Sequence, residues 1–98
     1  MILVRDVFQL KFGKARDAKA AWKEAESMMS QSDSPKPRML TDLTGPSYTF
    51  VLELEYESLA SYEANMQKTF ANDEWRQWYQ KFTPLVESGR REIFTIVE

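Results

Sequence analysis

Seven aromatic or basic side chains are the candidates for a ligand-binding site. They are Arg5, Tyr48, Tyr62, Trp75, Trp78, Tyr79 and Arg91. Trp75, Trp78 and Phe82 recur at helical spacing, and with aromatic residues of the predicted strands they could wall an apolar cleft, where small ligands commonly bind. The alternative is plain core packing, the commoner role of aromatic stripes. Both roles are compatible with one another, and the sequence leaves the choice open.

Three charged residues, Arg5, Asp6 and Arg91, lie inside otherwise apolar strands. A charge in that setting is costly unless it is paired, and because side chains alternate along a strand, Arg5 and Asp6 must point to opposite sheet faces. A strand arginine beside aromatic rings could orient an anionic or carbonyl-bearing ligand. We favour a structural role for these arginines, either in a dimer-interface bridge or in an ion pair with one of three glutamates, Glu53, Glu55 or Glu92.

Histidine and cysteine are both absent from the sequence. Their absence removes the usual imidazole base, the usual axial ligand of haem, and every thiolate nucleophile or disulfide. Metal binding would need carboxylates alone, and sequence pairs such as Glu53 with Glu55 are too ordinary to indicate a cage. The chain has 3 glycines and no glycine-rich phosphate loop. We therefore expect neither a metal nor a cofactor.

Charge and hydropathy narrow the partners and the compartment. The 13 basic and 15 acidic residues are interspersed, so no basic stripe for nucleic acid is expected. No apolar run approaches the length of a membrane span, and residues 1–10 lack the features of a signal peptide. We expect a cytoplasmic protein with no membrane partner. At 98 residues the chain suits one hydrophobic core, so we expect residues 1–98 to form a single domain.

The first half of the chain predicts a strand, a helix and a hairpin. Residues 2–12 read as a strand that is apolar on both faces, and residues 14–31 as an amphipathic helix. Residues 32–37, rich in serine and proline, form a connecting loop. Residues 38–44 and 48–56 then predict two strands joined by a turn at Gly45-Pro46.

The second half predicts two helical segments and a final strand. Ser58 is expected to cap a helix that begins at Leu59, and Asn72 or Asp73 to cap a renewed segment. Pro84 is expected to bend that segment, and Gly89 to end it in a left-handed conformation. Residues 91–97 predict the last strand.

This order of elements predicts a ferredoxin-like α+β sandwich, β-α-β-β-α-β, with the helices on one face of the sheet. The opposite face also receives apolar side chains, which are Leu3, Val7, Val51, Phe94 and Ile96. Because a bare apolar face of this size is unusual in soluble monomers, we expect two chains to pair these faces as a twofold homodimer.

Three stretches carry a resemblance to a known family. Residues 7–14 are similar to a first strand that runs into a Lys-x-Gly-Lys turn, and residues 52–62 to a third strand passing into the second helix. Residues 75–82 and 88–94 are similar to the end of that helix and the final strand. On these stretches the chain resembles the dimeric α+β barrel superfamily and, within it, the NIPSNAP-like branch. The resemblance implies a dimeric α+β barrel.

Two functional hypotheses follow. The first is a small NIPSNAP-like barrel protein that binds a small apolar or aromatic ligand between its helices and its sheet. The alternative, implied by the superfamily resemblance, is a cofactor-independent monooxygenase acting on an aromatic substrate. Four residues have the side-chain types for it, namely Asn72, Trp78, Tyr79 and Arg91. The sequence leaves open whether the protein is an enzyme.

Overall fold

The computed structural model describes residues 1–31 and 34–98, so the expected loop at 32–37 lies partly outside the described residues. The elements in chain order are β1 (Ile2–Leu10), α1 (Ala15–Ser30), β2 (Arg38–Thr41), β3 (Thr49–Tyr56), α2 (Leu59–Phe70), α3 (Asp73–Phe82), a 3-10 turn η1 (Thr83–Leu85) and β4 (Val86–Thr95). The strands form one sheet in the order β2-β3-β1-β4, and every neighbouring pair is antiparallel. The predicted ferredoxin-like α+β fold is confirmed.

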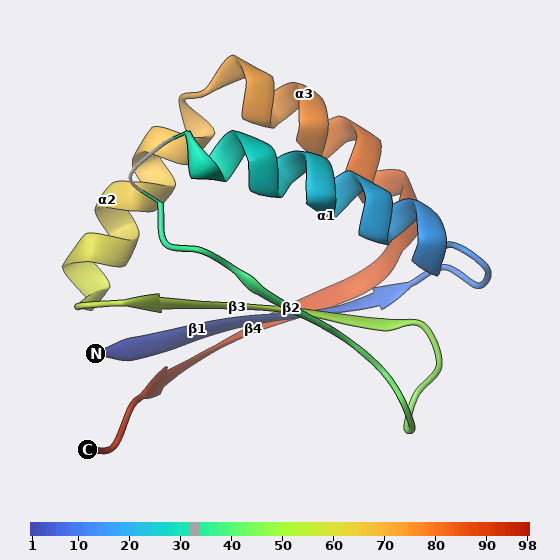
Figure 1. The fold of residues 1–98 in the computed structure, drawn as a ribbon, viewed down its shortest axis with the longest axis horizontal. Coiled ribbons are helices and arrows are strands. Elements are labelled where there is room, and N and C mark those ends of the chain that lie inside the picture. Colours follow the sequence, from blue (N-terminus) through green and yellow to red (C-terminus); the bar gives the residue numbers. More distant parts are fainter. Residues whose placement is uncertain (32–33) are drawn as a thin grey trace.

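All three helices lie on one side of the sheet (Figure 1). The helices α1 and α3 run alongside each other above the strands, while α2 lies at the end of the sheet near the N-terminus (Figure 1). No described element covers the other side, which we call the open face. Within the described residues, no helix combines the length and the apolar character that a membrane crossing requires.

Alternation along β1 decides which side chains meet the helices. Val4 and Leu10 belong to the buried core, each no more than 2% exposed, whereas Arg5 points to the open face and pairs with Glu53. Asp6 has the same parity as Val4 and therefore lies on the helix side, 8% exposed. Arg5 and Asp6 thus occupy opposite faces, as predicted.

The core is built around the indole of Trp22, which α1 inserts between the sheet and α3. Its ring stacks on Phe50 at 6.0 Å and meets Trp78 and Phe82 edge-on at 4.7 and 5.4 Å between centroids. Trp78 and Phe82 also stack on one another at 5.4 Å. Offset and edge-to-face contacts are the favoured geometries of aromatic pairs, so this half of the interior is filled with rings.

Both predicted helix caps are confirmed. The Ser58 hydroxyl accepts a hydrogen bond from the amide of Ser61 at 3.1 Å, and the Asn72 side-chain oxygen accepts one from the amide of Trp75 at 3.1 Å. Each cap satisfies an amide of the first turn that has no partner within the helix. Asn72 therefore separates α2 from α3 and sets where α3 begins.

The prediction for Gly89 is wrong. Gly89 does not end a helix in a left-handed conformation, because β4 already begins at Val86 and Gly89 lies inside it. A Cβ at this position would lie 3.1 Å from Cδ1 of Phe8, so the glycine makes room for a ring from the neighbouring strand. The strand predicted at 38–44 is likewise shorter, ending at Thr41.

Candidate functional site

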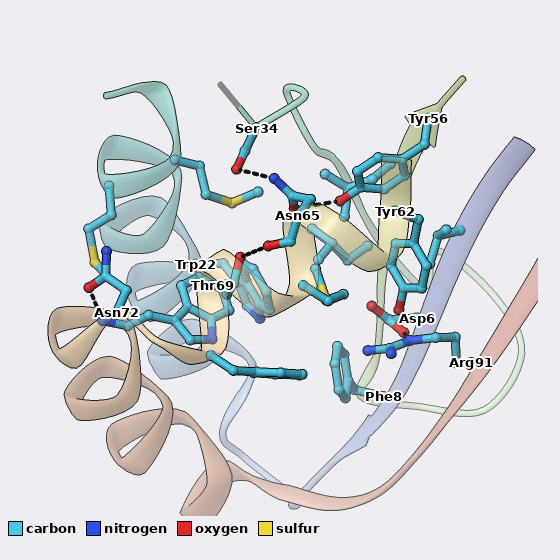
Figure 2. A pocket seen from close by; sticks show the side chains of 18 residues that line it. Asp6, Phe8, Trp22, Ser34, Tyr56, Tyr62, Asn65, Thr69, Asn72 and Arg91 are labelled. Atoms are coloured by element: carbon cyan, nitrogen blue, oxygen red, sulfur yellow. Dashed lines mark hydrogen bonds and ion pairs between the residues drawn. The ribbon is translucent and has the colours of Figure 1, made fainter. Parts of the chain in front are cut away.

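A cavity of about 130 Å³ lies between α1, α2 and the helix side of the sheet. Its floor is made by strand residues that include Val4, Leu52 and Leu54, and its walls by side chains of α1, α2 and the start of α3. Figure 2 shows these side chains converging on one hollow. Most are aliphatic or aromatic, and Met28 and Met66 are among them, so the cavity is suited to an apolar molecule.

One end of the cavity carries an ion pair. Nε of Arg91 donates to Oδ1 of Asp6 at 2.6 Å, and the guanidinium lies 5.7 Å from the ring centroid of Tyr62. Burial lowers the pKa of Arg91, but the hydrogen bond and charge of Asp6 outweigh it and raise that pKa overall. The predicted glutamate partner for Arg91 is therefore wrong, because antiparallel register places Asp6 directly opposite it. Arg91 therefore keeps its charge at neutral pH.

A chain of hydrogen bonds closes the cavity on the side of α2. The hydroxyl of Tyr56 donates to the Asn65 side-chain oxygen at 3.1 Å, and the Asn65 amide donates to the Ser34 hydroxyl at 3.0 Å. Asn65 thus ties α2 both to β3 and to the segment that follows α1 (Figure 2). Burial, together with nearby Tyr62 and Asp6, raises the pKa of Tyr56 to about 12. The phenol therefore stays a neutral donor.

Two other side chains that line the cavity have polar atoms without a hydrogen-bond partner among the described residues. They are the indole Nε1 of Trp22 and the hydroxyl of Tyr62, and both atoms are buried. Burial also raises the pKa of Tyr62, so its hydroxyl keeps its proton at neutral pH.

A second, more open hollow lies between α3 and β4, next to the first. Asp6, Phe8 and Arg91 line both hollows and so form the partition between them. The second hollow is completed by side chains that include Tyr79 and Thr83. Its lining is polar and apolar in about equal parts, whereas the lining of the first hollow is mostly apolar.

The structure brings three of the seven predicted site residues to the cavity, Tyr62, Trp75 and Arg91. Tyr79 lines the second hollow instead. Trp78 is 2% exposed, does not line the cavity, and donates its indole N–H to the carbonyl of Ala21 at 2.6 Å. The aromatic stripe therefore serves both predicted roles, since Trp75 is lining and Trp78 is core.

The remaining two predicted residues lie elsewhere. Tyr48 is in the turn before β3, beside Phe12, with their ring centroids 4.8 Å apart. Arg5 lies on the open face, where it forms ion pairs with Glu53 at 3.4 Å and Glu92 at 3.8 Å. For Arg5, the predicted glutamate pairing is confirmed.

The four residues considered for a monooxygenase are not assembled in one place. Asn72 and Arg91 line the cavity, Tyr79 lies in the second hollow, and Trp78 lies in the core. The side-chain oxygen of Asn72 is already used to cap α3. The described residues thus do not bring together the four side chains considered for that chemistry. In the described part of the chain, no three acidic side chains gather where a metal ion could be held.

Among the cavity residues that sequence reasoning missed are Asp6, Trp22 and Asn65. The sequence contained a signal for Asp6. Side chains alternate along a strand, so Asp6 points to the same side as Val4 and Phe8, which is the side that meets the helices. Trp22 carried the signal of a core residue only. Asn65 carried none, since its role depends on Tyr56 and Ser34, which lie on other elements.

The fold is similar to several solved structures. An uncharacterized NIPSNAP domain protein from Burkholderia xenovorans has a TM-score of 0.90 at 14% identity, over 99% of this chain and 95% of that chain. A NIPSNAP family protein from Agrobacterium tumefaciens has a TM-score of 0.90 at 15% identity, covering 99% of this chain and 86% of that one. A protein described as a putative antibiotic biosynthesis monooxygenase from Nitrosomonas europaea has a TM-score of 0.78 at 15% identity, covering all of both chains (100% each).

These similarities show only the fold, because each of the three structures is less than 25% identical to the chain. None of the curated proteins matches the chain in sequence. The family is shown by the sequence itself, because the NIPSNAP family model matches residues 5–98. The chain therefore belongs to the NIPSNAP family, within the dimeric α+β barrel superfamily.

Proposed function

We propose that this NIPSNAP protein is a homodimer that binds a small apolar or aromatic molecule in the cavity between α1, α2 and the sheet. The observation that carries the proposal is the cavity itself, with its volume of about 130 Å³ and its mostly apolar lining. An engineered apolar cavity of about 150 Å³ in another protein takes up benzene, so this volume suits a molecule with one ring.

The arrangement of polar groups supports binding rather than an unfilled packing defect. The single ion pair, Asp6 with Arg91, lies at one end of the cavity, while Val4, Leu52 and Leu54 provide an apolar floor. Ligand sites typically combine an apolar lining with a few placed polar groups that fix orientation. A ligand would therefore lie with its apolar part over the floor and its polar end toward Asp6 and Arg91.

The open face supports the dimer. Leu40 is 39% exposed on this face, in one row with Val51 and Val7, and Phe94 is 47% exposed next to Leu3. Exposed apolar patches on a sheet mark an interaction surface. A second copy packed by a twofold axis would cover this face with an identical one, as the name of the superfamily implies.

Binding can be tested by titrating the protein with toluene and measuring both heat and the chemical shifts of the methyl groups around the cavity. We expect saturable binding, with shifts confined to cavity residues such as Leu54 and Met66. A Met66→Trp variant should abolish binding, because the larger side chain fills the hollow. The matched control is Leu59→Trp, at a 60% exposed position of the same helix that does not line the cavity.

Saturable binding that survives Met66→Trp would contradict the proposal, because it would place the ligand elsewhere. Absence of any binding would contradict it as well.

A further inference from the structure

The tryptophans of the core differ in how their indole N–H groups are satisfied. Trp22 and Trp78 are 3% and 2% exposed and pack edge-on against one another. Trp78 donates to the carbonyl of Ala21, whereas Nε1 of Trp22 has no partner among the described residues. Buried donors are almost always hydrogen-bonded, because an unmade bond leaves the cost of removing the group from water uncompensated. Trp22 lines the cavity and Trp78 does not.

The tyrosines around the cavity show the same contrast. The hydroxyl of Tyr56 is paired with Asn65, whereas the buried hydroxyl of Tyr62 has no hydrogen-bond partner among the described residues. Figure 2 shows the Tyr62 hydroxyl directed toward the Asp6 and Arg91 end of the cavity. Both unused donors belong to side chains that line the same hollow, whereas Trp78 and Tyr56 are satisfied by the protein.

The charge of the lining restricts what these donors could receive. Asp6 and Arg91 are the charged side chains among the residues that line the cavity, and their charges cancel at 2.6 Å. A carboxylate ligand would meet the buried carboxylate of Asp6, and a cation would meet Arg91. A neutral ligand avoids both costs.

We infer that the ligand is a neutral molecule with one ring and a carbonyl-type oxygen, and that this oxygen accepts a hydrogen bond from Trp22 Nε1 or from the Tyr62 hydroxyl. This inference rests on the proposed function and names the class of ligand. The ring would occupy the apolar floor, and the oxygen would satisfy a donor that the protein leaves open.

The test compares three probes of similar size. Acetophenone has the acceptor oxygen, α-methylstyrene replaces it by a methylene group, and benzoate is charged. We expect acetophenone to bind about tenfold more tightly than α-methylstyrene, as one additional buried hydrogen bond would give, and benzoate to bind more weakly than either. Equal affinity of the first two probes, or preference for benzoate, would overturn the inference.

The indole N–H signals in a ¹⁵N-¹H spectrum and two variants identify the donor. If Trp22 is the donor, acetophenone should move its indole signal, and it should leave the Trp78 signal in place because that N–H is bound to the carbonyl of Ala21. Trp22→Phe or Tyr62→Phe should remove the preference for acetophenone while α-methylstyrene binding is kept. The control is Tyr79→Phe, which lies outside this cavity and should retain the preference.

The two proposals fail differently in this experiment. If both neutral probes bind in the cavity with equal affinity, the class of ligand is wrong and the binding function stands. If neither binds, both proposals fail. If the preference for acetophenone persists in both Phe variants, other groups recognise the oxygen and the inference is overturned.

Discussion

The two faces of the sheet handle their charges in opposite ways. On the helix side, a single pair, Asp6 with Arg91, is set among apolar side chains. On the open face, four charged residues alternate in sign in a row across all strands, in the order Arg38, Glu53, Arg5, Glu92. Arg38 lies 2.5 Å from Glu53, whose side chain is 11% exposed.

This difference indicates what each face is suited to contact. One isolated pair leaves a cavity with a mostly apolar lining on the helix side, which suits a small molecule. A row of alternating charges beside Leu40 and Phe94 suits contact with another protein surface. Because the row contains both signs, it can pair with the same row of a second copy related by a twofold axis. In our proposal the helix side binds a ligand and the open face binds a second chain.

The largest expected effect concerns the open face. Phe94→Asp places a carboxylate on this face in both chains, so we expect the dimer to weaken by more than about 100-fold, measured by sedimentation velocity. Phe94 is 47% exposed, so the fold of each chain should be retained. The control is Leu43→Asp, at a 97% exposed position in the β2–β3 connection. A dimer of unchanged strength in the Phe94 variant would refute the assignment of the open face.

The next effect concerns the helix-side pair. Arg91→Met leaves the buried carboxylate of Asp6 without its partner, and we expect the free energy of unfolding to fall by about 2 kcal/mol. Urea denaturation of the Phe94→Asp monomer measures this change without a contribution from dimerisation. Arg90→Met, one position earlier in β4, serves as the control. A loss no larger than that of the control would mean that the pair contributes little to folding.

A smaller effect is expected when the row on the open face is broken. Arg5→Met removes the ion pairs with Glu53 and Glu92, but the Arg5 side chain is 40% exposed and Arg38 still pairs with Glu53. In the same monomeric background we expect a loss of less than about 1 kcal/mol, since exposed ion pairs contribute little. A loss that exceeds the effect of Arg91→Met would reverse the comparison between the faces.

The smallest expected effect is the dependence of stability on pH, because the group concerned does not titrate near neutral pH. The pKa of Tyr56 is about 12 in the folded chain, above its ordinary value of 10.0. Between these values the unfolded chain loses the proton that the folded chain keeps, so the contribution of Tyr56 to stability should be constant below about pH 10 and should fall as the pH rises toward 12. Tyr56→Phe should reduce this fall in urea denaturation series. A rise in stability across this range would contradict the account.

The local patterns of the chain predicted the elements well. Ser58 and Asn72 identified their helix starts, because a cap depends on residues within one turn. Gly89 was misassigned because its role is set by Phe8, which is remote in sequence and lies on the neighbouring strand. Local sequence thus predicted the element boundaries that are determined by contacts within one turn. It did not predict the boundary that depends on a neighbouring strand.

The site was predicted only in part for the same reason. Arg91 was recognised as a strand charge that needs a partner, but its partner Asp6 follows from the register between β1 and β4. Register between distant strands is not encoded in spacing along either strand. The helical repeat of Trp75 and Trp78 likewise could not show that α3 turns one toward the cavity and the other into the core.

A crystal structure of the protein grown with bromobenzene tests the central claim most directly, because the anomalous signal of bromine locates the ligand and the lattice reveals the pairing of open faces. The account predicts a bromine peak in the cavity between Leu54 and Met66, with two open faces packed across a twofold axis. The division of roles between the two sides of the sheet would be contradicted by a cavity that contains no bromine, together with a bromine peak on the open face and no second chain packed against that face.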